Sequence, residues 1–105
     1  MPLPPPQDQH ISLAAAAELT RAYRQQAGPS GTKACLFLRQ YVAELMAQPA
    51  LGGVRIYYGL DAGGGSTMVM VGVDQNGNDV TAGTILNNHY PCPPFCDGGG
   101  SALNG

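Results

Sequence analysis

The residues best suited to chemistry lie near the end of the chain, where His89, Cys92, Cys96 and Asp97 follow one another closely. Imidazole nitrogen, thiolate sulfur and carboxylate oxygen are the atoms through which proteins bind zinc. Three prolines among these residues restrict the backbone, which lowers the entropy lost when such donors gather around an ion. The pattern therefore predicts a metal site for zinc, which Cys35 or a second subunit would complete.

Two other interpretations of these cysteines stay open. Structural zinc sites usually hold two cysteine pairs, each with two residues between its members, whereas Cys92 and Cys96 form one pair with three residues between them. The pair is also a candidate for thiol redox chemistry, although no helix begins after it to lower a thiol pKa. In the third interpretation, both cysteines are small apolar groups that anchor a proline-rich C-terminal strap, residues 89–97.

The chain has three cysteines, and their expected state depends on where the protein resides. The first residues, Met1-Pro-Leu-Pro-Pro-Pro, have no cationic start and no apolar segment, so they do not resemble a secretory signal. We therefore expect a cytoplasmic protein, in which an odd number of cysteines would be thiols or metal ligands and not disulfides.

The surface of this protein is expected to carry few charges. Charged residues make up 11% of the 105 residues, and the net charge is −2, whereas roughly 25% of residues are charged in ordinary soluble domains. Such a surface is easily desolvated and repels itself little, which favours a homo-oligomer, with an unidentified protein partner as the alternative. The five Lys and Arg residues form no basic stripe, and no apolar run could span a membrane, so neither nucleic acid nor membrane is an expected partner.

A second candidate site lies in the middle of the chain, where apolar residues alternate with others over residues 54–60. This alternation predicts a strand with one buried face, which puts Arg55 and Tyr57 together on the opposite face. Arginine and tyrosine are enriched in protein interfaces. We therefore predict that Arg55 and Tyr57 contribute to an interface, unless a helix or the strap covers their face.

Two helices are expected before these strands. Ser12 is a good N-cap for a helix that continues to about Gln26, and Gly28 can end that helix in the left-handed conformation. A second amphipathic helix is predicted from about residue 30 or 32 to Met46, and Pro49 stops it. Leu51-Gly52-Gly53 is then expected to be the turn that leads into the first strand.

Three strands are expected, over residues 54–60, 67–73 and 79–86, with a tight turn at Asn76-Gly77 between the last two. Residues 67–73 are apolar on both faces and should form the central strand. Because strands follow helices, we predict an α+β fold in which two N-terminal helices pack on an antiparallel sheet of about three strands, closed by the Pro/Cys-rich strap. Residues 1–10 should be a flexible proline-rich arm, residues 11–97 a single domain, and residues 98–105 a flexible glycine-rich tail.

Three strings of this sequence stand out together: Val54-Arg-Ile-Tyr-Tyr-Gly-Leu-Asp61, Val69-Met-Val-Gly-Val-Asp-x-x-Gly-x-Asp79 and Pro91-Cys-Pro-Pro-Phe-Cys96. With them, the chain resembles a group of short bacterial proteins that contain these strings in the same order. No activity is known for that group, so the resemblance implies none. It does imply that the strap is part of the domain.

These observations favour a non-enzymatic, self-associating structural or protein-interaction module that needs no cofactor. With seven Asp and Glu residues and no paired carboxylates, acid–base catalysis has few candidate groups. The alternative is a small metal-binding or thiol-redox protein that uses His89, Cys92 and Cys96.

Overall fold

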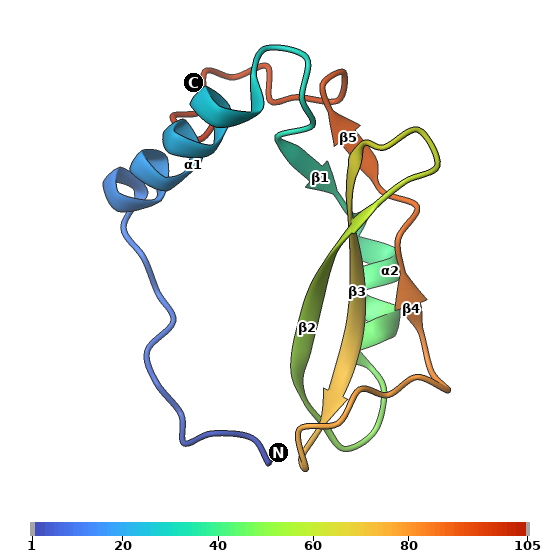
Figure 1. Ribbon diagram of the computed structural model, residues 1–105. Helices are drawn as coiled ribbons and strands as arrows, with labels where there is room; N and C mark the ends of the chain where they lie inside the picture. Colours follow the sequence, from blue (N-terminus) through green and yellow to red (C-terminus); the bar gives the residue numbers. More distant parts are fainter. Residues whose placement is uncertain (1, 105) are drawn as a thin grey trace. The chain divides into compact units, whose positions relative to one another are not determined.

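A computed structural model describes residues 2–104, and the contacts among them divide the chain into two compact units. The first, which we call the sheet unit, comprises residues 2–6 and 37–89. The second, the strap unit, comprises residues 7–36 and 90–104. Both contain a helix and antiparallel strands, so the predicted α+β class is confirmed (Figure 1).

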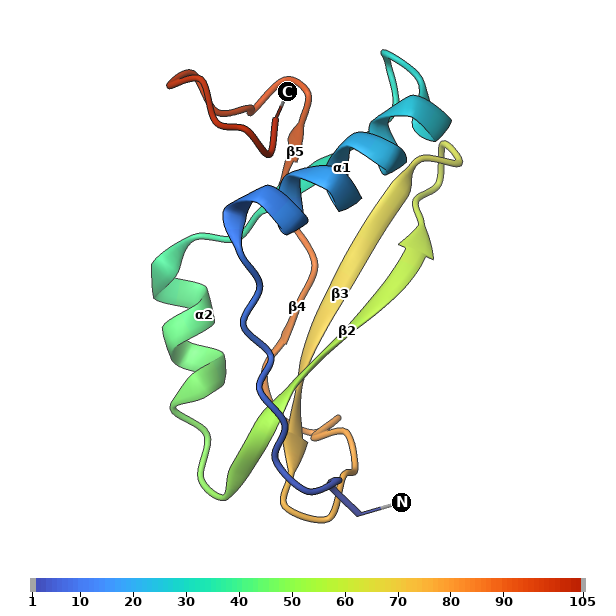
Figure 2. The same cartoon turned by 90° about the vertical axis from the view of Figure 1, so that its left-hand side faces the viewer.

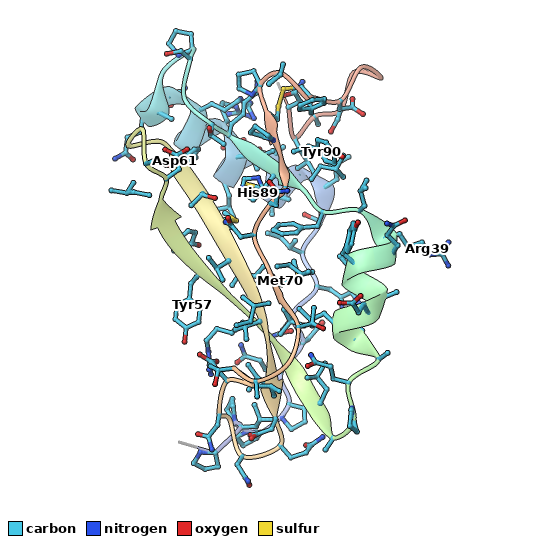
Figure 3. The ribbon with its side chains drawn as sticks, turned by 90° about the vertical axis from the view of Figure 1, so that its right-hand side faces the viewer. Arg39, Tyr57, Asp61, Met70, His89 and Tyr90 are labelled. Atoms are coloured by element: carbon cyan, nitrogen blue, oxygen red, sulfur yellow. A yellow bond between two sulfur atoms is a disulfide. The ribbon has the colours of Figure 1, made fainter. Side chains whose placement is uncertain are left out.

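The sheet unit is a three-stranded antiparallel sheet with one helix. Strands β2 (Leu51–Leu60), β3 (Ser66–Asp74) and β4 (Ile85–Leu86) lie in the order β2-β3-β4, so β3 is central, as its apolar pattern predicts (Figure 2). The helix α2 (Arg39–Met46) packs against β3. Figure 3 shows Met70 of β3 pointing toward this helix and Tyr57 of β2 pointing away from it.

The core of the sheet unit is small. Leu45 of α2 is fully buried, and Val71 and Val73 of β3 are 3% exposed each. Residues that lie opposite each other in an antiparallel pair share a face, and Arg55 is opposite Val71. The two valines therefore lie on the same sheet face as Arg55 and Tyr57.

The second helix starts later in the sequence than predicted. Residues Ala34–Leu36 form a strand, β1, and the helix starts only at Arg39. The sequence gives helical spacing to residues 34–46, but the main chain of β1 pairs with β5 (Tyr90–Cys92). Tertiary pairing with a distant segment has overridden a local helical pattern.

The turn predicted at Leu51-Gly52-Gly53 is also wrong, because these residues belong to β2. The chain turns earlier, at Ala50, whose φ is 58°. Gly52 sits where the register of β2 against β3 shifts, and a Cβ there would come within 2.9 Å of the Asp74 carbonyl oxygen. This glycine therefore permits a close approach of two strands and does not mark a loop.

The segment after Asn76-Gly77 folds back as predicted, but pairs only in part with β3. Asp79 forms a bridge with Val73, and Ile85–Leu86 form β4. Between them the Thr84 amide donates to the Gln48 side chain at 3.1 Å. A contact with Gln48, which lies just after α2, thus replaces part of the expected strand.

The strap unit contains α1 (Leu13–Ala27) and the two-stranded sheet β1-β5. Its helix boundaries confirm the prediction: the Ala15 amide donates to Ser12 Oγ at 3.1 Å, and Gly28 has a φ of 82°. However, α1 has no buried residue, although the predicted fold packs both helices on the sheet. Leu13 and Leu19 of this helix are 63% and 65% exposed.

The two ends of the chain make contacts within their own units. Leu3 of the predicted arm lies against Gly52 at the start of β2. In the predicted tail, the Leu103 carbonyl accepts from Arg24 at 2.6 Å and the Asn104 carbonyl from Lys33 at 3.3 Å. Segments without regular structure therefore supply part of each unit's packing.

Candidate functional site

The strap carries a disulfide between Cys92 and Cys96, so the expectation that these cysteines are thiols or metal ligands is wrong for this structure. A turn brings them together: the Phe95 amide donates to the Pro91 carbonyl at 2.9 Å, and the two cysteine Cα atoms are 4.7 Å apart. That separation lies within the normal range for disulfides. Local chain geometry therefore pairs the sulfurs, a possibility that counting cysteines could not reveal.

His89 and Asp97, the other predicted zinc ligands, have separate roles. His89 Nε2 lies 2.9 Å from Thr67 Oγ1, and its ring packs edge-on against Phe37 with 5.4 Å between ring centroids. The Asp97 carboxylate accepts from the amides of Gly99 and Ser101 at 2.9 Å each. Among residues 2–104, no three His, Cys, Asp or Glu side chains gather closely enough to hold a metal ion.

Cys35, the predicted additional ligand, lies in β1 opposite Pro91 and is a half-buried free cysteine. Burial raises the pKa of its thiol, which lowers the thiolate fraction near neutral pH. Its side chain is on the opposite face of the β1-β5 pair from Cys92, since Cys92 is paired with the neighbouring Ala34. Cys35 is therefore poorly placed to attack the disulfide.

The second predicted site is a connected cluster. Arg55 Nη1 lies 2.5 Å from Asp79 Oδ1, and the Tyr57 hydroxyl donates to Asp79 Oδ2. Arg55 also donates to the Gly77 carbonyl at 3.4 Å. The two residues predicted to share a face do so, and both bind the Asp79 carboxylate, which the sequence analysis had not placed in this site.

Asp79 reaches this position because of the turn that precedes it. Asp74 Oδ1 accepts from the amides of Asn76 and Asn78, at 2.9 and 3.0 Å, and Gly77 has a φ of 83°. The bridge to Val73 puts Asp79 on the opposite side of β3 from β2. Its bonds to β2 therefore cross the face of β3 above the buried valines. Long side chains such as arginine can shield apolar surface in this way.

The charges of this cluster are mutually stabilising. The hydrogen bond from Tyr57, together with the Arg55 guanidinium, lowers the pKa of Asp79 below its usual value. The same carboxylate raises the pKa of Tyr57 and of Arg55 above their usual values. The cluster thus holds an ionised carboxylate between a neutral phenol and a guanidinium. It is suited to holding the turn at residues 74–79 against β2.

The remaining side chains of β2 are unusually exposed for their type. Tyr58 is 85% exposed, Leu60 76% and Ile56 48%, and no residue of this ten-residue strand is buried. Alternation places these three on the face opposite Arg55 and Tyr57. The sequence pattern predicted a buried face here, whereas the structure leaves it largely open at the sheet edge.

No helix among the residues described here has both the length and the apolar character needed to cross a membrane. Comparison with known proteins adds no functional assignment. No protein-family model matches the chain, no curated protein is significantly similar to it, and no solved structure matches its fold.

Proposed function

We propose that this protein is a non-enzymatic module that associates with copies of itself through β2. The observation that carries the proposal is the exposure of Tyr58 and Leu60, at 85% and 76%, on the long edge strand of the sheet unit. Burying one such side chain contributes about 1.5–3 kcal/mol. An edge strand also offers unpaired amides and carbonyls that a second strand can satisfy.

The charge distribution supports association of identical chains. With a net charge of −2, two copies repel each other weakly. In this proposal Arg55 and Tyr57 remain part of the interface, and their bonds to Asp79 fix the side chains before association. Side chains held in advance lose less conformational entropy when an interface forms.

Tyr58→Asp tests the proposal, because it places a charge in the middle of the exposed apolar face. We expect the wild-type protein to form a defined oligomer whose mass rises with concentration, and the variant to stay monomeric. Light scattering after size exclusion measures both, and circular dichroism verifies the fold. Leu19→Asp, on the exposed side of α1, is the matched control and should leave the oligomer intact. A monomeric wild type, or an oligomer that only Leu19→Asp dissociates, would refute association through β2.

A second candidate function, thiol–disulfide exchange at Cys92 and Cys96, is favoured by the disulfide itself. Cys92 is 4% exposed and Cys96 is half-buried, so an external thiolate would attack Cys96. In such an exchange the incoming thiolate bonds to Cys96 Sγ, and Cys92 leaves as a thiolate that takes up a proton. A second thiol then releases Cys96, and the attacking pair is oxidised.

Equilibration with glutathione buffers of known ratio tests this second function, with the reduced fraction read by thiol labelling and intact mass. An exchange-active pair should be partly reduced within the glutathione range. A pair that stays oxidised in every buffer, with a potential below about −300 mV, is structural, and that result would exclude the exchange function.

A further inference from the structure

The ten-residue strand β2 is the longer of the two edge strands in the three-stranded sheet. Among the described residues, β2 is paired only with β3, while the opposite edge strand, β4, has two residues. The chain's own arm is a poor partner for this edge, because four of residues 2–6 are prolines, which have no amide hydrogen to donate. A second β2 has ten residues of matching length.

Symmetry limits how two copies of one strand can pair. A two-fold axis perpendicular to the sheet runs midway between the two strands, where one residue of β2 lies opposite its own copy. Residues equally far from that position, on either side, then lie opposite each other. An axis at Arg55 would place two guanidinium groups directly opposite, which is unfavourable. An axis at Tyr57 or Tyr58 would pair only the C-terminal part of β2.

We infer that β2 pairs antiparallel with β2 of a second copy about a two-fold axis at Ile56. This inference rests on the proposed self-association and specifies its geometry. The axis at Ile56 pairs Gly52 to Leu60 along almost the whole strand. It joins the two sheets into one continuous sheet and removes the exposed edge of each.

This register matches side chains on both faces of the joined sheet. On the apolar face, Ile56 lies beside the partner's Ile56, and Val54 lies beside the partner's Tyr58. These residues are 48%, 38% and 85% exposed in the single chain. Aromatic and β-branched pairs of this kind stabilise antiparallel strands.

On the other face, Arg55 lies beside the partner's Tyr57. The guanidinium keeps its bond to Asp79 and gains an aromatic neighbour, an arrangement that arginine favours. Each copy contributes one such pair, so the two charged clusters flank the axis without bringing like charges opposite each other. In this register, apolar side chains therefore pair on one face and each Arg55 pairs with a Tyr57 on the other.

A cysteine series reads the register directly. In a Cys35→Ser background, which removes the free thiol, single cysteines replace Arg55, Ile56, Tyr57 or Tyr58. Mild oxidation should convert the Ile56→Cys chain into a covalent dimer on a non-reducing gel. Two copies of Tyr58→Cys would be about 13 Å apart along the strands and should remain monomeric on that gel.

A mixture of Val54→Cys and Tyr58→Cys chains gives a second, independent measure, because these positions are opposite each other in the inferred register. The mixture should form a cross-linked heterodimer that neither chain forms alone. Ile85→Cys on β4 is the control for the opposite edge and should not cross-link.

The outcomes separate the inference from the proposed function. An oligomer in which Tyr57→Cys or Tyr58→Cys cross-links in place of Ile56→Cys would overturn the register and leave self-association through β2 in place. Cross-linking through Ile85→Cys alone would overturn pairing at β2. A protein that is monomeric at every concentration by light scattering would overturn both.

Discussion

The two units of this chain are stabilised in different ways. The sheet unit has a core of three fully or nearly fully buried apolar residues, Leu45, Val71 and Val73. The strap unit has one buried apolar residue, Cys92, and a helix with none. The strap unit is stabilised instead by a disulfide and by hydrogen bonds that Arg24 and Lys33 donate to main-chain carbonyls near the C-terminus.

This difference illustrates a general limit on small folds. Short segments cannot bury enough apolar surface to offset the entropy of ordering the chain, so covalent and polar links take over. The β1-β5 sheet has only three paired positions, whereas β2 and β3 pair along nearly their full lengths. The sheet unit should therefore respond to changes in packing, and the strap unit to changes in its links.

The largest expected effect is that of Leu45→Ala. Among residues 2–104, Leu45 is the large side chain that is fully buried, so this substitution should lower the free energy of unfolding by about 3 kcal/mol. Urea denaturation measures the loss, and hydrogen exchange should locate it in residues 37–89. The matched control is Leu19→Ala on α1, where 65% exposure predicts a change within about 0.5 kcal/mol. Equal effects of the two substitutions would contradict the contrast between the units.

A smaller effect is expected from Cys96→Ser, which removes the Cys92–Cys96 disulfide. The two cysteines are four positions apart, so this disulfide closes a short loop. The disulfide restricts the unfolded chain, and without it the free energy of unfolding should fall by about 2 kcal/mol. Hydrogen exchange should speed up for residues 90–104 and stay unchanged in β2 and β3. Cys35→Ser, which removes a cysteine without opening a link, provides the comparison. Faster exchange throughout the sheet unit would show that the disulfide stabilises both units.

The smallest expected effect is the contribution of the Asp79 cluster to stability, which changes with pH. Because the pKa of Asp79 is lowered, folding favours the carboxylate. Its contribution to stability is present above the unfolded pKa of about 3.9 and is lost as the pH falls through the lower folded pKa. The raised pKa of Tyr57 acts in the opposite sense: its contribution is present below about pH 10 and is lost as the pH rises through the folded pKa.

Carboxyl NMR shifts measured through an acid titration report the pKa of Asp79. Tyr57→Phe removes the main cause of the shift and should move the pKa of Asp79 upward. Tyr23→Phe, which removes a hydroxyl that donates to a main-chain carbonyl in the strap unit, should leave it unchanged. An Asp79 pKa that is the same in all three proteins would show that the cluster does not form in solution.

Features that depend on neighbouring residues could be predicted from the sequence. Ser12 and Gly28 bound α1 because capping needs only the residues beside a helix end. The alternation over residues 54–60 predicted β2, the apolar run over residues 67–73 predicted β3, and Asn76-Gly77 predicted the fold-back. All three patterns are set by short-range backbone geometry. The shared face of Arg55 and Tyr57 follows from the same alternation.

Features that join distant residues became visible in the folded chain and could not be predicted from local patterns. Residues 34–36 are a strand because β5, more than fifty positions away, pairs with them. Asp79 joins Arg55 and Tyr57 because the fold-back carries it across β3. Local patterns specify which conformations a segment favours, but the free energy of long-range pairing and burial selects among them, and that energy has no signature in a short stretch of sequence.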